Sequence, residues 1–140
     1  MQIGLYANTH GVGYRDDVNN YTRSVPGATL EPVAIAQTAE RNGFHSIWFP
    51  DHVCMPSETN SAHIANQTGA RSYSPRHEML DGAVVMGAVA SATNTIKLGT
   101  SVLVAPYRGP LSDARQFATV DVLSEGRLLL GVGAGWMAEE

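Results

Sequence analysis

Residues 96–136, IKLGTSVLVAPYRGPLSDARQFATVDVLSEGRLLLGVGAGW, change their hydrophobic periodicity twice within one uninterrupted segment. Residues 96–104 are mostly apolar and β-branched, with small residues among them, which is typical of a strand buried on both faces. Pro110 suits the first turn of a helix, and apolar residues then recur at helical spacing until Ser-Glu-Gly at 124–126 ends the helix. Residues 128–132 are apolar and too few for a buried helix, so they indicate a second strand. The segment therefore predicts a βαβ unit with parallel strands.

The rest of the chain repeats this alternation of strand and helix. Residues 2–7 and 44–50 are short apolar runs that predict two more strands. Thr29 can cap a helix that lies between them, and Asp81 can cap a further helix over residues 82–92. We therefore predict an α/β fold with a four-stranded parallel sheet in chain order, formed by residues 3–6, 47–49, 96–104 and 128–132.

Several linked sequence motifs resemble those of one family. They are AERNGFHSIWFPDH at 39–52, LGTSVLVAPYRGP at 98–110, DVLSEGRLLLGVGAGW at 121–136 and the acidic pair at 139–140. In this order they resemble the luciferase-like monooxygenase superfamily, and within it the branch that uses the deazaflavin coenzyme F420. The resemblance covers nearly the whole chain. It implies a flavin-type oxidoreductase on a TIM (β/α)₈ barrel and leaves the substrate open.

The length of the chain does not match a whole barrel. A (β/α)₈ barrel needs about 250 residues, whereas the sequence has 140 residues. We therefore expect residues 1–140 to be the N-terminal part of a single luciferase-like TIM-barrel domain, a truncated half with about four parallel strands. A half barrel leaves strand edges unpaired and lacks the phosphate-binding loops of the later strands. By itself it should associate into homo-oligomers, bind flavin weakly and turn over no substrate.

Composition narrows the classes of partner. The chain is 44% hydrophobic and 16% charged, with a net charge of -4, so it has no basic surface suited to nucleic acid. Its longest apolar run, residues 82–92, is too short to cross a bilayer. No signal segment follows Met1, and the single cysteine, Cys54, cannot form an internal disulfide. We expect a cytoplasmic protein whose partner is a small-molecule substrate, with neither nucleic acid nor membrane involved.

Asp51 and His52 form the clearest chemical signal in the sequence. They follow the strand predicted at 44–50, at the end where TIM barrels place their ligands. There one residue can orient its neighbour while the other reaches the ligand, and histidine can act as general acid or base near neutral pH. From the residues alone, His52 could equally be an ordinary surface histidine. The resemblance implies a catalytic pair with His52 as proton donor or acceptor, because F420-dependent relatives carry an active-site histidine at this strand end.

The resemblance also places the cofactor at the ends of the third and fourth strands. The expected cofactor-binding residues are Thr100, Ser101, Val102, Gly133 and Trp136. It implies a non-proline cis peptide at Ser101–Val102, which would back the central ring of the flavin. The alternating glycines around Gly133 would let the chain approach the cofactor. A Rossmann turn fits poorly, since the motif follows the fourth strand and has no acidic residue about 20 positions on. For Trp136, plain core packing remains an alternative.

The other candidate residues have less specific patterns. The polar segment 53–77 is long enough to be a substrate-shaping loop. It contains His63 and Cys54 but no paired CxxC or HExxH motif, so we expect no metal site and a free thiol. Arg108 could contact a ligand phosphate or carboxylate, or pair with Asp113, and we expect the pair. Asn8, Thr9 and His10 follow the first strand and would lie at the rim of the site, although purely local hydrogen bonding would explain them too.

Two functions of different classes are compatible with these observations. The first is an oxidoreductase in which F420, or FMN as the alternative, exchanges hydride with an organic substrate while His52 handles the proton. The second is a non-catalytic fragment, or a flavin-binding relative without turnover. The motifs favour the first, with either monooxygenase or dehydrogenase chemistry.

Overall fold

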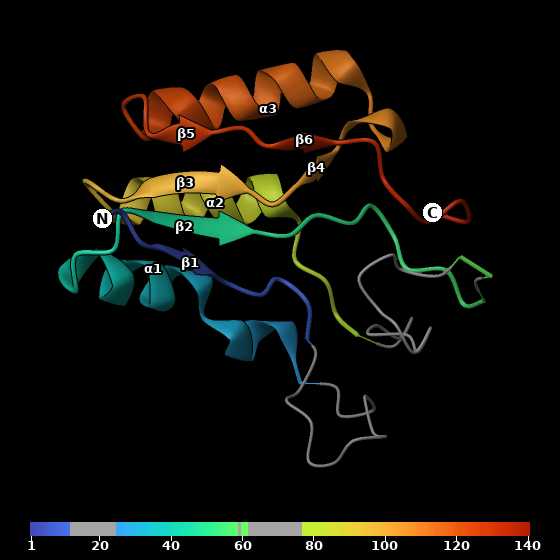
Figure 1. Cartoon of the computed structure of the whole chain (residues 1–140), viewed down its shortest axis with the longest axis horizontal. Helices are drawn as coiled ribbons and strands as arrows, with labels where there is room; N and C mark the ends of the chain where they lie inside the picture. The colour runs from blue at the N-terminus through green and yellow to red at the C-terminus, as the bar shows by residue number, and fades with distance from the viewer. Residues whose placement is uncertain (12–24, 59, 62–76) are drawn as a thin grey trace.

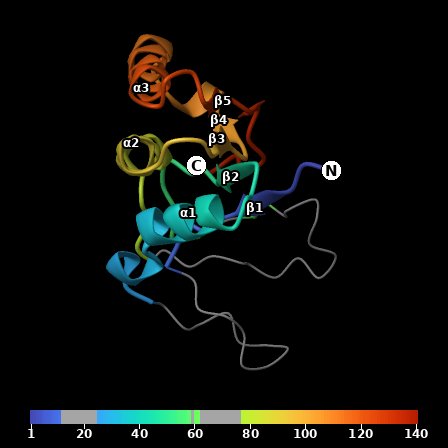
Figure 2. The ribbon, with the colours of Figure 1, turned by 90° about the vertical axis from the view of Figure 1, so that its left-hand side faces the viewer.

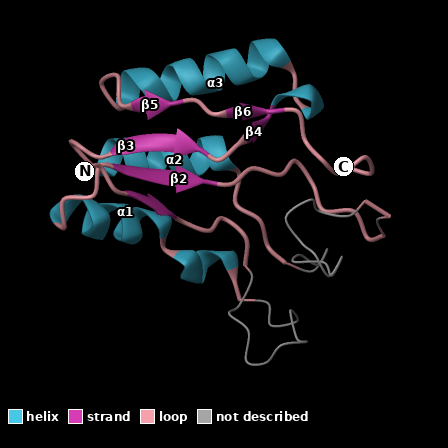
Figure 3. Cartoon of the chain, viewed as in Figure 1, coloured by secondary structure: helices cyan, strands magenta, loops and turns pink. Residues whose placement is uncertain are grey.

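The structure is a computed structural model that describes residues 1–11, 25–58, 60–61 and 77–140. Strands and helices alternate along the chain and form a main sheet and a short two-stranded pair, with helices beside them (Figures 1 and 3).

Four parallel strands form the main sheet, in the order β1-β2-β3-β5. They are β1 (Gly4–Tyr6), β2 (Ser46–Phe49), β3 (Lys97–Thr100) and β5 (Leu128–Leu129). Each strand pairs with the next in parallel, which confirms the strand order predicted from the sequence. Because all four run the same way, their carboxyl ends meet at one edge of the sheet, on the right of Figure 1.

The third and fourth predicted strands are each interrupted, which the hydrophobic pattern did not predict. Their outer parts, β4 (Leu103–Val104) and β6 (Val132–Gly133), form a separate parallel pair. The Ser101–Val102 peptide before β4 is cis, as the resemblance implied. The Thr100 hydroxyl spans the break: it donates to the Gly131 carbonyl at 2.7 Å and accepts from the Gly131 N–H at 2.9 Å. A Cβ at Gly131 would overlap the Thr100 carbonyl, so this close approach requires glycine.

Three helices cover one face of the sheet (Figure 2). They are α1 (Pro32–Arg41), α2 (Gly82–Ala92) and α3 (Pro110–Leu123), and short 3-10 turns, η1 (Gly27–Leu30) and η2 (Ala105–Tyr107), lie before α1 and α3. Ile47, Phe49 and Leu98 are fully buried in the hydrophobic core with Met86 of α2. The apolar side of each strand therefore faces the helices, as a βαβ arrangement requires.

The opposite face of the sheet carries Trp48. In the parallel register Trp48 lies beside Tyr6 of β1 and Gly99 of β3, and its indole N–H donates to the Ser46 hydroxyl at 2.9 Å. A Cβ at Gly99 would overlap the Trp48 ring, so glycine gives the ring its space. Tyr6 is 56% exposed, because no second layer of the described chain covers this face (Figure 2).

The helix ends follow the sequence signals with one exception. Asp81 caps α2 as predicted, its side chain accepting the Val84 N–H at 3.1 Å. The chain leaves α3 at Ser124, as predicted, and the next two residues have positive φ. The predicted Thr29 cap of α1 is wrong. Glu31, with a positive φ, occupies the N-cap position, and Thr29 hydrogen-bonds within the preceding 3-10 turn.

Glu40 at the end of α1 fixes the turn that leads into β3. Its Oε1 accepts the backbone N–H groups of Asn94, Thr95 and Ile96 at 2.8, 2.5 and 3.0 Å. Burial acts to raise the pKa of this carboxyl, but these hydrogen bonds outweigh burial and lower the pKa to about 2. The ionised carboxylate therefore stabilises the connection between α1 and the turn after α2.

Replacing Glu40 by glutamine is expected to lower the free energy of unfolding near neutral pH by about 1 kcal/mol, a value that allows for solvent screening of a partly exposed group. A lowered folded-state pKa gives stability that is present above the ordinary value of 4.5 and is lost as the pH falls toward 2. Urea unfolding near neutral pH and at about pH 3 should show the difference from wild type shrinking in acid. The exposed Glu58→Gln change is the control, and an equal deficit for Glu40→Gln at both pH values would contradict the argument.

Candidate active site

A cavity of about 470 Å³ opens at the carboxyl ends of the strands. Cofactors and small ligands occupy pockets of roughly 300–1,000 Å³, so the space suits a molecule of that class. Of the catalytic and cofactor-binding residues expected from the sequence, all except Thr100 line the cavity: Asp51, His52, Ser101, Val102, Gly133 and Trp136. Asn8, Thr9 and His10, expected at the rim, are not among the lining residues.

His52 lies just beyond the end of β2, and its side chain is largely buried. Its Nδ1 lies 3.0 Å from Oε2 of Glu140. The ring meets two others edge-on: the centroid of His10 is 5.3 Å away and that of Trp136 is 6.4 Å away. His52 is thus held on several sides at the wall of the cavity.

Two acidic residues that the sequence analysis did not assign to the site connect the segment after β6 with the loop after β2. Glu140 uses its second oxygen to accept the Val53 N–H at 2.6 Å, and its side chain is 1% exposed. Glu139 accepts the Ser61 hydroxyl at 2.6 Å. The sequence signal that could have indicated them is an acidic pair soon after a glycine-rich strand end. The same pair is also typical of the first turn of a helix. Together the two carboxylates hold the loop that carries His52.

Asp51 accepts hydrogen bonds from two later parts of the chain. Its Oδ2 accepts the Val104 N–H at 3.0 Å and Nε of Arg108 at 3.2 Å, while its Oδ1 contacts Nη2 of Arg108. The Asp51 side chain is 4% exposed. This carboxylate therefore joins the end of β2 to β4 and to the start of α3.

Arg108 corrects one sequence expectation. It does not pair with Asp113 as predicted; it bonds Asp51 and, at 3.3 Å, the Asp81 carboxylate that caps α2. Burial alone would lower the pKa of Arg108, but the hydrogen bonds and charges of the two aspartates raise it. The guanidinium is thus a permanent cation. From the turn before α3, it binds the end of β2 through Asp51 and the start of α2 through Asp81.

Thr100 and Val102 lie on the two sides of the strand break. Thr100 is buried and its hydroxyl holds Gly131, so it supports the cavity from behind. Val102 is 42% exposed and lines the cavity with Ser101. A Cβ at Gly133 would come within 2.5 Å of the Val102 side chain, so glycine at this position keeps the wall open.

Trp136 lies at the mouth of the cavity and is only partly buried, so the alternative of plain core packing does not describe it. The chain reaches it through Gly135, whose φ of +81° favours glycine. A Cβ at Gly135 would press on the Tyr107 hydroxyl, which donates to the Met137 carbonyl at 2.7 Å. The turn that presents Trp136 is therefore fixed on both sides.

His10 belongs to the site more closely than the sequence indicated. It is 1% exposed, and its ring meets His52 although the two residues follow different strands. Burial, helped by the nearby His52 and His77 and opposed by Asp51, lowers the pKa of His10 to about 4. Burial also lowers the pKa of His77. His10 is therefore uncharged near neutral pH.

The remaining sequence expectations concern metals, the thiol and membranes. In the described ranges, no group of three His, Cys, Asp or Glu side chains is placed to hold a metal ion. Cys54 is exposed, with its sulfur 3.7 Å from the Glu140 carbonyl oxygen. His63 and most of the predicted loop 53–77 lie outside the described residues. No described helix combines the length and the apolar character needed to span a bilayer.

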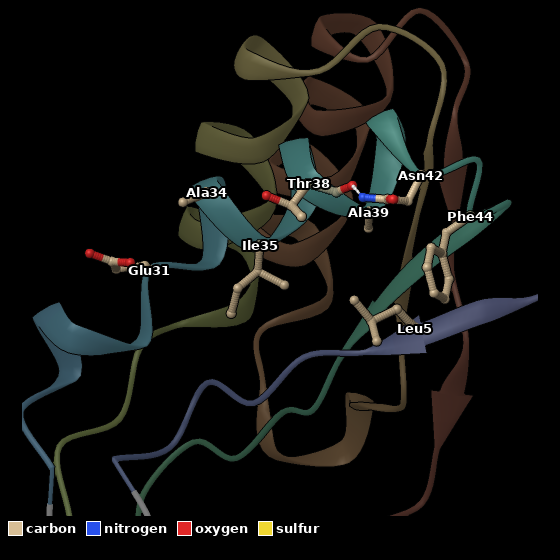
Figure 4. Close-up of a pocket in the computed structure, with 8 residues that line it drawn as sticks. All are labelled: Leu5, Glu31, Ala34, Ile35, Thr38, Ala39, Asn42 and Phe44. Carbon is tan, nitrogen blue, oxygen red and sulfur yellow. Dashed lines mark hydrogen bonds between the residues drawn. The ribbon is translucent and has the colours of Figure 1, made fainter.

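A second hollow of about 310 Å³ lies between α1 and the edge strand β1 (Figure 4). Leu5, Ile35 and Phe44 give it an apolar floor, and Glu31 is the acidic residue at its rim. It contains no pair of side chains suited to proton transfer or nucleophilic attack, so the cavity beside His52 is the candidate active site.

The model of the luciferase-like monooxygenase family matches residues 19–140. The chain belongs to this family. The parallel sheet with helices on one face is accordingly part of a luciferase-like TIM barrel, as the motifs implied. Proteins to which the chain is similar include both an F420-dependent and a flavin-dependent enzyme.

Two curated relatives illustrate this range. The chain is 36% identical over 136 residues to the F420-dependent glucose-6-phosphate dehydrogenase of Amycolatopsis mediterranei, covering 96% of this chain and 32% of the dehydrogenase. It is 31% identical over 105 residues to the oxygenase component of the flavin-dependent trigonelline monooxygenase of Acinetobacter baylyi, covering 75% of this chain and 24% of that protein. The chain thus spans a third or less of the length of these two relatives.

A solved structure shows the same fold. The monooxygenase RslO1 from Streptomyces bottropensis matches with a TM-score of 0.65 at 22% sequence identity, covering 99% of this chain and 35% of that chain. At this identity the match is evidence of the fold and not of a shared substrate.

Proposed function

We propose that this chain supplies the ring-binding part of an oxidoreductase that uses coenzyme F420, with FMN as the alternative, to exchange hydride with a small organic substrate. The observation that carries the proposal is the convergence of His52, Val102, Gly133 and Trp136 on one cavity at the carboxyl ends of the strands. Similarity to the F420-dependent dehydrogenase over 96% of the chain supports F420. Similarity to the flavin-dependent monooxygenase keeps FMN as the alternative.

The cavity wall fits a flat, largely apolar ring. The exposed Val102 side chain and the bare Gly133 backbone lie against each other, so no side chain projects between them. Ser101, Val102, Gly133 and Trp136 would hold the ring, and Thr100 would support them by fixing the strand break. When bound, such a cofactor supplies the centre that accepts or releases hydride.

His52 is suited to move the proton that accompanies hydride exchange at an alcohol or carbonyl. A carboxylate accepts hydrogen bonds, so the contact of Glu140 with Nδ1 of His52 places a hydrogen on that nitrogen. In the neutral ring the other nitrogen, Nε2, then carries the lone pair, and we assign to it the transfer of the proton to or from the substrate. Glu140 thereby fixes both the orientation and the tautomer of His52.

For Asp51 we propose a positioning role in place of the catalytic one that the resemblance implied. Both of its oxygens bind donors from Val104 and Arg108, so the carboxylate serves to hold the strand ends that carry His52 and Val102. We assign it as a positioning residue.

Cofactor titration tests this proposal, with the chain placed in a complete barrel and binding followed by visible absorbance. F420 is expected to saturate the site with one equivalent per chain and to bind at least about tenfold more tightly than FMN. Gly133→Leu should weaken binding by about tenfold or more, because the new side chain enters the cavity. Gly87→Ala is the matched control, since a Cβ there meets nothing within 4 Å. If neither cofactor binds, the proposal is wrong; binding without turnover of any alcohol or carbonyl substrate would leave a flavin-binding protein.

A further inference from the structure

The His10–His52 pair brings two imidazole rings from different strand ends to one place. The ring centroids are 5.3 Å apart and the planes meet at 73°, so the rings contact edge to face. His10 is 1% exposed, and the proposed function assigns no role to it. Two imidazoles at this distance could not both carry a charge without repelling each other strongly.

The hydrogen bonds of His10 fix its tautomer. The His10 backbone N–H donates to Oδ1 of Asn8 at 3.0 Å, which identifies this atom as the oxygen of the amide. The Nδ1 atom of His10 lies 3.0 Å from the same oxygen. Because an amide oxygen can only accept, Nδ1 must carry the hydrogen. The lone pair of the neutral ring is then on Nε2.

The surroundings of His10 also favour the neutral ring. The titratable groups that act on it are His52 and His77, which disfavour a charge, and Asp51, which favours one. The negative charge of Asp51 is already matched by Arg108. Burial is the largest influence, and the pKa of His10 falls to about 4.

We propose that His10 is a positioning residue that stays neutral and so reserves the exchangeable proton of the His10–His52 pair for His52. Asn8 sets this arrangement by holding the hydrogen of His10 on Nδ1. Glu140 holds the corresponding hydrogen of His52 on its Nδ1, so the two imidazoles are oriented by separate acceptors. The inference rests on the proposed function for its catalytic meaning, while the protonation state of His10 can be measured without any cofactor.

Nitrogen-15 NMR of histidine-labelled protein tests the protonation state directly. His10→Gln identifies the His10 signals by removing them, and His45→Gln, at the other end of β2, is the matched control. At about pH 6 the His10 ring is expected to be neutral with its hydrogen on Nδ1. Asn8→Ala should at least double the fraction of the other tautomer. A charged His10 ring at that pH, or a hydrogen on Nε2 in the wild-type protein, would overturn the proposal.

Turnover of the cofactor-loaded barrel tests the consequence for His52. His10→Arg places a lasting positive charge beside His52, because a guanidinium keeps its proton even when buried, and is expected to move the pH profile of kcat/KM by about one unit toward acid. His10→Gln removes the ring without adding charge and should leave the profile in place. Identical profiles for the two variants would overturn the proposal. If His52→Ala keeps full activity, the proposed role of His52 is wrong, whatever the His10 variants show. The NMR experiment then still decides whether His10 is neutral.

Discussion

Replacing His52 by alanine in a complete, cofactor-loaded barrel is expected to lower kcat by about 100- to 10,000-fold, the range typical of lost general acid or base catalysis. KM should change little, because the proton moves in the transition state and not in substrate binding. The structural basis is the contact of Glu140 with Nδ1, which orients the His52 ring at the cavity wall. Steady-state kinetics over a series of substrate concentrations provides both constants.

His45→Ala is the matched control for this experiment. It changes a histidine next to the amino end of the same strand, away from the cavity, and should alter kcat by less than about twofold. A His52→Ala variant with unchanged kcat and a raised KM would show that His52 only positions the ligand. In that case the proton transfer would have to be assigned to another group.

Replacing Arg108 by alanine is expected to lower the free energy of unfolding by about 3 kcal/mol, since it leaves a buried carboxylate without its cation. Asp51 would retain only the Val104 N–H of the partners that hold it now, and Asp81 would lose its ion pair. Urea unfolding near neutral pH measures this difference. Cavity residues on β2 and β4 should lose alignment as well, so cofactor affinity should fall together with stability.

Arg115→Ala provides the comparison, because this arginine is exposed on α3 and its loss should cost less than about 0.5 kcal/mol. A double variant, Asp51→Leu with Arg108→Met, removes both charges and should recover part of the lost stability. A loss below about 1 kcal/mol for Arg108→Ala would contradict this expectation. It would mean that water enters the variant and solvates the Asp51 carboxylate in place of Arg108.

The order of the main sheet could be predicted from the sequence because local patterns determine it. Apolar runs separated by capped helices leave short crossovers, and short crossovers permit little besides neighbouring parallel strands. The break after Thr100 was not visible in the hydrophobic pattern, because Val102 and Val104 continue the β-branched run across it. The Thr29 cap failed because a 3-10 turn takes up that residue before α1 begins.

The site was predictable where it follows strand ends and not where it depends on distant partners. Asp51 and His52 could be placed at the cavity because carboxyl ends of parallel strands meet at one edge, and Gly133 because of the family resemblance. Arg108 was paired with its near neighbour Asp113, whereas its true partner Asp51 lies 57 positions away. Glu140 was not assigned to the site, and His10 was placed only at its rim, because no local pattern shows that either one meets His52.

The contact between His52 and Glu140 joins positions 88 apart in the chain. During synthesis at about 5–20 residues per second, the histidine therefore emerges roughly 4 to 18 s before the carboxylate that orients it. Through that interval the first strands and helices can assemble, but the imidazole has no fixed tautomer. The scaffold around His52 can thus form before the contact that orients its imidazole.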